Sequence, residues 1–279
     1  MGRPEIHLSK LLVTVLLFSQ SLLAFSQDTA GRTVESEHST LFGVGSGSVY
    51  DSYLSPYSYS GTELRVIRET MRETRLMDGR VSYHTMVDAH ASLLENRPGN
   101  VNEYAGGVRY SNAWLYDLRE LSVGVRGLSL FVGPAVSGYL GGVYNERNGN
   151  NPAQLKTDVM IDAKVMARYD FTLWRCDMRV TYQMNVPLLG CAFSPNYGQS
   201  YYELFSLGNY DGNVVFANVF NSPSWRHLLT VEIPTVVGNV RVGYCGEFMQ
   251  AKFNNLGYHS YSHNFMLGWV KNFGLRKRK

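Results

Sequence analysis

Residues 158–173, DVMIDAKVMARYDFTL, alternate between two kinds of side chain. The odd-numbered positions from Val159 to Phe171 are all apolar or aromatic, whereas the even-numbered positions carry five charges. Side chains of a β-strand alternate between two faces, whereas an α-helix would scatter both sets around its circumference. The segment therefore predicts a strand with one wholly apolar face and one charged face.

The same alternation recurs along most of the chain. Segments with period-two spacing are separated by turn-rich stretches from Leu41 to Phe273. Residues 63–74 are charged on both faces, and we assign them to a strand only because of their neighbours. The sequence predicts ten strands, at residues 41–50, 63–74, 81–94, 103–118, 128–144, 157–172, 176–188, 225–234, 239–252 and 260–273.

The last predicted strand indicates what the apolar faces contact. From Tyr261 to Phe273 every second residue is bulky and mostly apolar, whereas the residues between are mostly small or polar. A soluble sandwich would bury the bulky face, whereas a membrane barrel would turn it toward lipid. No segment after residue 26 has about 18 consecutive apolar residues, so a mature protein in a membrane would cross it as a closed barrel. The even strand number and the alternating long and short connections favour an all-β, antiparallel transmembrane β-barrel.

Residues 189–224 are too many for a plain hairpin turn. Connections of this length are usually functional or disordered, and the many aromatic residues argue against disorder. We expect this segment to form a plug or lid, with an external aromatic binding surface as the alternative. If it contributed a hairpin, the barrel would have twelve strands. The candidate ligand-binding residues are Tyr197, Tyr201, Tyr202, Phe205 and Tyr210.

The N-terminal segment predicts the compartment of the protein. Basic residues precede an apolar run from Leu11 to Phe25, and small residues follow, which is typical of a secretory signal peptide. We therefore expect a signal peptide at 1–26, a polar leader at 27–39, the barrel at 40–274 and a basic tail at 275–279. The predicted location is the outer membrane of a Gram-negative cell, with the lipid bilayer and the barrel-assembly machinery as partners.

The charged strand faces would line the lumen. A charge on the lipid face would cost about 2–4 kcal/mol near the midplane, and a barrel of this size has a narrow, side-chain-filled interior. We therefore expect a network of paired polar residues and no large pore. Its predicted members are His84, Asp88, His90, Asp162, Lys164, Arg168, Arg179, Arg226, Glu232, Arg241 and Glu247.

Two groups of residues could in principle bind a metal or take part in catalysis. His84, Asp88 and His90 share one strand face and would suit a metal or a proton relay, although a hydrogen-bonded lumen is the simpler interpretation. The stretch YHSYSH places His259, Ser260, Ser262 and His263 together, but no third orienting group and no GxSxG motif accompany them. The sequence thus predicts no catalytic residue, no metal and no cofactor.

Composition excludes other classes. Without residues 1–26 the chain has 24 basic and 22 acidic residues, a near-balance that argues against a nucleic-acid partner. The three cysteines form no CxxC pair and, being odd in number, allow at most one disulfide bond. The glycines of GVGSGS at 43–48 lack the lysine of a phosphate-binding loop.

Three stretches carry a family resemblance: PLLGCAFSPNYGQSYYELFSLGNYDGNVVF, PSWRHLLTVEIP and YHSYSHNFMLGWVKNF. They resemble an uncharacterised exported family, known mainly from Bacteroides-type bacteria, that carries a domain-of-unknown-function label. The resemblance implies an outer-membrane-type barrel and no activity. We therefore predict a barrel with a structural, binding or minor-transport role. The alternatives are a barrel-embedded lipid-modifying hydrolase and a soluble exported β protein that binds a ligand through aromatic residues.

Overall fold

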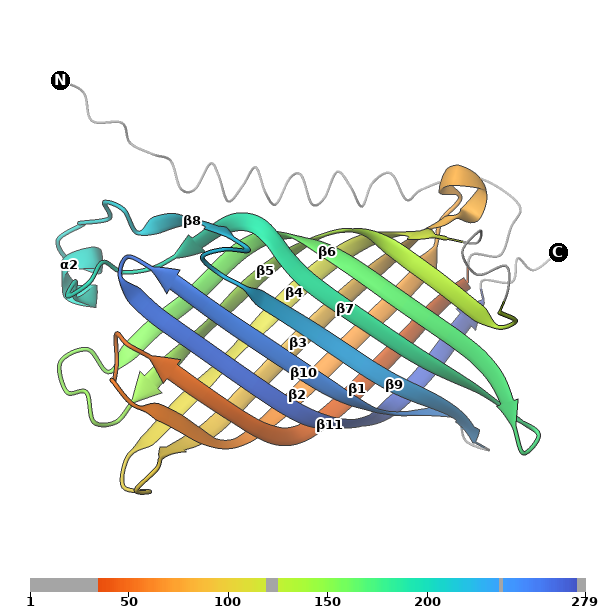
Figure 1. Cartoon of the computed structure of the whole chain (residues 1–279), viewed down its shortest axis with the longest axis horizontal. Coiled ribbons are helices and arrows are strands. Elements are labelled where there is room, and N and C mark those ends of the chain that lie inside the picture. Colours follow the sequence, from red (N-terminus) through yellow and green to blue (C-terminus); the bar gives the residue numbers. More distant parts are fainter. Residues whose placement is uncertain (1–34, 119–124, 236–237, 275–279) are drawn as a thin grey trace. The chain divides into compact units, whose positions relative to one another are not determined.

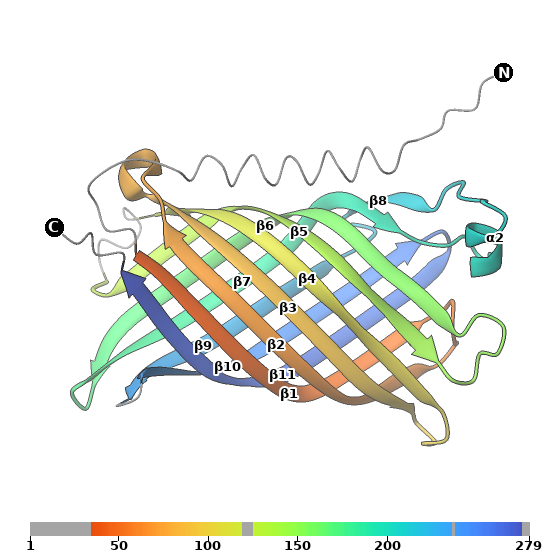
Figure 2. The same ribbon diagram turned by 180° about the vertical axis from the view of Figure 1, so that it is seen from behind.

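The computed structural model describes residues 35–118, 125–235 and 238–274. Within these ranges, ten strands form a closed antiparallel barrel (Figures 1 and 2). This confirms the predicted fold class and the strand number of ten. The barrel strands are β1 (Glu35–Asp51), β2 (Ser58–Glu73), β3 (Val81–Asn96), β4 (Asn102–Asp117), β5 (Leu128–Asn145), β6 (Ala153–Leu173), β7 (Cys176–Phe193), β9 (Ser224–Thr235), β10 (Gly238–Phe253) and β11 (Leu256–Gly274).

Closure joins the first strand to the last. Each barrel strand pairs with its neighbour in the chain, β7 pairs with β9, and β1 pairs with β11 along its whole length. This closure leaves no open edge at β1 or β11 and satisfies the backbone groups along their shared ladder internally. We call the end at which β1 begins and β11 ends the terminal end, and the opposite end the distal end.

The predicted sidedness of the strands is confirmed. In β11, Phe265 and Leu267 are exposed on the outside, whereas Asn264 and Met266, which alternate with them, are buried inside. β6 follows the same rule: Val159, Ile161, Val165 and Tyr169 are exposed, whereas Met160, Asp162, Lys164 and Met166 are buried. In the described part of the chain, no second sheet covers these apolar faces, because all the strands belong to one sheet.

The turns at the two ends correct one expectation. Trp174 and Arg175 form a two-residue turn at the terminal end, and Asn254 and Asn255 form one at the distal end. All four have positive φ, as tight hairpins of this kind require, and asparagine tolerates that conformation well. The predicted alternation of long and short connections therefore holds only in part, because a two-residue turn lies at the same end as the long connection 194–213.

Residues 189–224 do not extend the barrel by a hairpin. β7 continues to Phe193, and the chain then forms a short helix, α2 (Tyr201–Phe205), and the strand β8 (Val214–Asn218), which pairs with β7 alone. Figure 1 places α2 beyond the distal strand ends, so residues 194–213 lie at the rim, and we call them the lid. A 3₁₀ turn, η1 (Leu76–Gly79), lies at the terminal end. No helix in the described part of the chain is long and apolar enough to cross a membrane.

β1 begins at Glu35, inside the stretch predicted as a polar leader, and residues 63–74 fall almost entirely within β2. The predicted signal peptide at 1–26 and the basic tail at 275–279 lie outside the described residues.

Candidate functional site

The centre of the lumen holds a buried arginine surrounded by carboxylates. Arg65 on β2 donates to Glu63 at 3.1 Å, to Asp88 on β3 at 2.9 Å and to Glu247 on β10 at 2.7 Å. It also donates to the hydroxyl of Ser262 on β11, at 3.1 Å. A buried charge requires partners of this kind. We call these five residues the Arg65 cluster, and they tie four strands together.

A second cluster lies closer to the terminal end. Arg241 on β10 contacts Glu37 at 2.7 Å, Glu232 at 3.0 Å and Glu69 at 3.2 Å. Glu37 on β1 also accepts from two arginines on β6 and β7, across the lumen. The Arg241 cluster consists of Glu37, Glu69, Arg168, Arg179, Glu232 and Arg241.

Further contacts fill the space between the two clusters. Asp162 accepts from Asn185 at 2.6 Å and from Arg226 at 3.2 Å, and Lys164 Nζ lies 3.1 Å from His84 Nδ1. Two cavities that border these side chains measure about 20 and about 10 Å³. Since a single water requires about 10–15 Å³ by this measure, the central lumen is packed with side chains.

The structure places the predicted lumen residues in three ways. Eight are buried: His84, Asp88, Asp162, Lys164, Arg226, Glu232, Arg241 and Glu247. Arg168 and Arg179 are partly buried, and Arg179 also contacts Asp170 at the terminal rim. His90 is partly buried and stacks on the ring of Tyr139.

The predicted histidine–aspartate constellation is divided among different partners. His84 contacts Lys164, Asp88 contacts Arg65, and His90 stacks on an aromatic ring. In the described ranges no group of three or more His, Cys, Asp or Glu side chains is arranged to hold a metal ion.

Sequence reasoning missed the residues around which the clusters form. Glu63, Arg65 and Glu69 lie in the segment whose two faces are both charged, which hid their shared inward face. Glu37 fell in the predicted leader. The usable signal was the two-residue spacing Glu63, Arg65, Ile67 and Glu69, all of which are buried.

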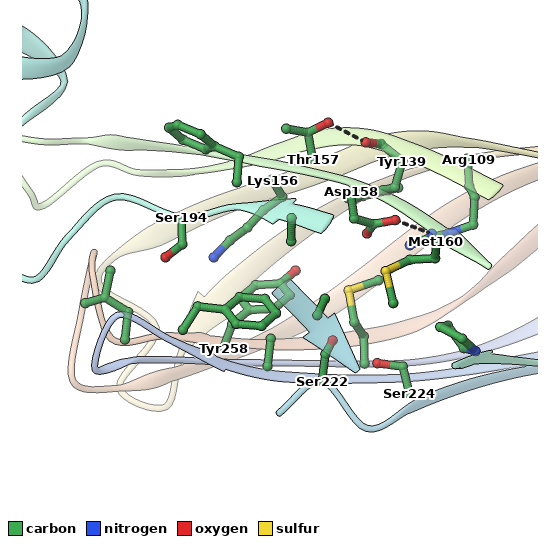
Figure 3. Close-up of a pocket in the computed structure, with 18 of the residues that line it drawn as sticks. Arg109, Tyr139, Lys156, Thr157, Asp158, Met160, Ser194, Ser222, Ser224 and Tyr258 are labelled. Atoms are coloured by element: carbon green, nitrogen blue, oxygen red, sulfur yellow. Dashed lines mark hydrogen bonds and ion pairs between the residues drawn. The ribbon is translucent and has the colours of Figure 1, made fainter. Parts of the chain in front are cut away.

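Toward the distal end, the lumen contains a cavity of about 70 Å³ (Figure 3). Arg109 on β4 contacts Asp158 at 3.0 Å, and its guanidinium lies 4.6 Å above the ring of Tyr139. Lys156 contacts Asp51 at 2.9 Å and lies 3.9 Å above the ring of Tyr258. Each cation thus has a carboxylate and an aromatic ring as partners. The rest of the lining of this distal cavity includes the charged pair Arg226 and Glu247 and a set of apolar or small residues: Met160, Ala192, Ala217, Ser222, Met249 and Phe253.

The lid is anchored to the rim by two tyrosines. The Tyr201 hydroxyl accepts a hydrogen bond from the Leu155 backbone N–H at 2.6 Å, and the Tyr53 hydroxyl donates to the Gln199 carbonyl at 2.9 Å. Burial raises the pKa of both phenols, and that of Tyr53 reaches about 12, with the nearby charges of Asp51 and Glu203 adding to the shift. Both hydroxyls therefore stay protonated at neutral pH.

The five predicted aromatic residues do not form one site. Tyr197, Tyr202, Phe205 and Tyr210 are exposed, and Tyr201 is half-buried. Tyr201 and Tyr202 border a groove of about 790 Å³ on the distal rim, whereas the other three lie outside it. We call it the rim groove. None of its lining residues is charged, and its remaining polar or aromatic members are Tyr104, Tyr144, Asn150, Asn151, Gln154 and Ser200.

The residues of YHSYSH lie on two faces of β11. Ser262 points into the lumen and accepts from Arg65, whereas His263 is exposed outside with its Nδ1 2.5 Å from the Tyr244 hydroxyl. His259 contacts the Tyr261 hydroxyl at 3.1 Å. The strand alternation therefore separates Ser262 from His263. The three cysteines are free, with Cys245 buried and the other two exposed.

Comparisons with known proteins give a family and a set of distant barrels. A family model described as "Protein of unknown function (DUF3316)" matches residues 9–279. No curated protein matches the sequence. Among solved structures, the outer membrane protease OmpT from Escherichia coli is 11% identical, with 88% of this chain and 99% of that chain covered and a TM-score of 0.46.

Two further barrels are similar at the same distant level. The transport unit of the autotransporter AIDA-I from Escherichia coli is 10% identical, with 92% of this chain and 96% of that chain covered and a TM-score of 0.42. The translocator domain of the autotransporter NalP from Neisseria meningitidis is 9% identical, with 96% and 99% covered and a TM-score of 0.36. With scores and identities this low, these similarities say nothing about what this chain binds or does.

Proposed function

The chain belongs to this DUF3316 family of unknown function, so we propose a role from its own geometry: a barrel of the Gram-negative outer membrane with a closed lumen that binds a ligand at its distal rim. In this proposal the chain is inserted by the barrel-assembly machinery after residues 1–26 are removed. The single observation that carries it is the contrast between the two faces of the barrel wall. The outward side chains are apolar, whereas the inward side chains form ion pairs.

The outer surface supports the membrane placement. Its exposed apolar residues come from strands all around the barrel. The apolar surface that they form is far larger than the isolated apolar patches of a soluble protein. Lipid contact removes the cost of exposing such side chains to water. They include Val44, Val66, Val108, Val136, Leu140, Val159, Ile161, Val165, Leu229, Phe265, Leu267 and Trp269.

The ion pairs that cross the lumen argue against diffusive transport through the barrel. The Arg241 cluster joins β1 to β6, β7 and β10 across the interior, and the Arg65 cluster joins β2 to β3, β10 and β11. Buried ion pairs of this kind resist rearrangement, because separating them leaves charges without partners. A solute that crossed the barrel would have to displace both clusters.

The rim groove supports binding of an uncharged, hydroxyl-rich ligand such as a neutral saccharide. Tyrosine rings offer flat apolar surfaces with a polar edge, and asparagine amides offer both donors and acceptors. Concave sites that combine aromatic walls with a few polar groups are the usual small-ligand sites. The absence of charge in the described lining disfavours ionic ligands.

Membrane placement and lumen closure are tested with the purified full chain. We expect extraction only with detergent, a folded band that shifts on heating, and no porin-sized conductance steps in planar bilayers. Extraction into detergent-free buffer would overturn the membrane placement, and large conductance steps would overturn the closed lumen.

The binding role is tested by titrating neutral oligosaccharides against intrinsic fluorescence. We expect Tyr202→Ala and Tyr104→Ala to weaken binding, because both residues line the rim groove. Tyr210→Ala is the matched control, since Tyr210 is exposed on the same lid but lies outside the groove. Equal affinity in all three variants, or no binding to the parent chain, would refute this role.

A further inference from the structure

The strand that pairs with β7 changes along its length. Going toward the distal end, β7 pairs first with β9, up to Asn185 opposite Arg226, and then with β8, from Leu189 opposite Asn218. β8 and β9 therefore occupy successive parts of the same ladder position. Between them the chain makes a short excursion, residues 219–223.

β10 flanks this ladder position on the side opposite β7. It forms hydrogen bonds with β9 and with residues 219–223, but it does not pair with β8. Its backbone N–H groups at Gln250 and Lys252 donate to the carbonyls of Pro223 and Asn221, at 3.2 and 2.8 Å. Just beyond, the side chain of Asn254 donates to the Gly212 and Ser194 carbonyls, at 3.0 and 3.2 Å. Hydrogen bonds thus hold β10 and Asn254 to the neighbouring chain on both sides of β8. They involve residues 221–223 toward the terminal end, and Gly212 and Ser194 at the distal end.

Between these two sets of bonds, side chains alone close the wall. β8 pairs only with β7 among the described strands, so no backbone ladder links it to β10. Instead Phe253 of β10 and Val215 of β8 pack against a small cluster that contains Ala192 and Ala217. We call this stretch of wall, bounded by β8 and Phe253, the window. A wall held by apolar contacts opens at much lower cost than one held by a ladder.

The window separates the distal cavity from an apolar outer surface. Ala217 and Phe253 line that cavity, so its interior begins directly behind them. On the outer side Val214, Phe216 and Phe220 are exposed, Phe220 at 91%. Phe216 pairs with Cys191 of β7, and Cys191 pairs with Val159 of β6, so Phe216 is level with this exposed apolar residue two strands away. The membrane placement on which this step rests is the one proposed above.

We propose that the window is a lateral portal through which the acyl chain of a lipid or a fatty acid enters the distal cavity from the membrane. The cavity measures about 70 Å³, which suits the end of an unbranched chain better than a bulky fused ring system. The three cations in its lining, Arg109, Lys156 and Arg226, already have carboxylate partners, so the entering group is the apolar tail and not an anionic head. Phe253 is the side chain that must turn aside.

The test measures binding of cis-parinaric acid by fluorescence to the full chain in a steroid-based detergent, whose bulky fused rings fit the cavity poorly. Ala217→Trp fills the window from β8 and should weaken binding about tenfold or more, which corresponds to about 1.4 kcal/mol. Phe253→Ala opens the window and should speed association several-fold. Phe216→Ala is the matched control, because Phe216 lies on β8 but points outward, and it should bind as the parent chain does.

Competition identifies the source of the chain. Displacement of the probe by laurate alone assigns the portal to free fatty acids, whereas displacement also by a lysophospholipid assigns it to lipid acyl chains. A folded Ala217→Trp variant with parental affinity, together with unchanged association in Phe253→Ala, overturns the portal. Because binding is measured in detergent and folding by the heat-dependent gel shift, loss of the portal is distinguishable from failure of the membrane or rim-groove proposals.

Discussion

Two parts of the same lumen are built from different interactions. In the central part, Arg65 and Arg241 each contact three carboxylates, and the cavities beside them hold little more than a water. In the distal part, small and apolar side chains such as Ala192, Ala217 and Met249 leave a larger cavity behind a wall without a complete ladder. The central part resists rearrangement, whereas the distal part has room to admit a ligand.

The largest effect is expected from removing the central arginine. Arg65→Met leaves Glu63, Asp88 and Glu247 buried without their cation, and breaking a buried ion pair typically costs about 3–5 kcal/mol. We expect a lower urea midpoint for the heat-modifiable folded band, measured on gels after refolding into micelles.

Arg68→Met is the control for this variant. Arg68 lies on the same strand but is exposed on the outer face, so its removal should change the free energy of unfolding little. If both variants lost the same stability, the central cluster would not be the rigid part of the barrel.

A pair of identical substitutions compares the two parts directly. Met166 is almost completely buried against Leu115, Phe131 and other residues, so Met166→Ala should cost about 2–5 kcal/mol. Met249 already borders the distal cavity, and Met249→Ala should cost clearly less, because fewer packing contacts are lost. Calorimetry or urea titration of both variants checks the order, and equal losses would show that the distal part is packed as tightly as the centre.

The fold was predictable from sequence because its main signal is local. Alternation along β6 and β11 fixes which side chains face outward, whatever the distant parts of the chain do. The segment that became β2 was ambiguous, because Arg68 and Arg72 add charge to its outer face. Context assigned it as a strand but did not reveal Arg65 as the centre of a cluster.

The site was less predictable because it depends on pairings across the barrel. Arg241 contacts Glu37, which lies about 200 residues earlier in the chain, and no local pattern indicates such a pair. The window depends on the position of β8 in the ladder, which the sequence left open between a lid and two more strands. The aromatic residues of 189–224 were visible in sequence, but only the structure separates Tyr201 and Tyr202 from the others.

A smaller effect is expected where the lid meets the rim. Tyr201→Phe removes the hydroxyl that accepts the Leu155 N–H and should cost about 1 kcal/mol, mostly as local opening of the lid. Limited proteolysis within 194–213 should become faster while the global urea midpoint barely moves. Tyr202→Phe, an exposed neighbour on α2, should leave the cleavage rate unchanged, and equal acceleration in both would argue against this anchor.

The smallest effect concerns pH and the second anchor of the lid. The pKa of Tyr53 is raised from 10.0 to about 12 by burial and by the charges of Asp51 and Glu203, so the folded rim prefers the neutral phenol. The stabilising contribution is therefore fully present below pH 10 and is lost as the pH rises toward 12. Ionisation also removes the proton that Tyr53 donates to the Gln199 carbonyl. We expect proteolysis of the lid to accelerate over this interval in the parent chain, and Tyr53→Phe to cleave faster at neutral pH with a flatter pH profile. A variant that kept the parental profile would place the alkaline transition at another group and leave the lid without this switch.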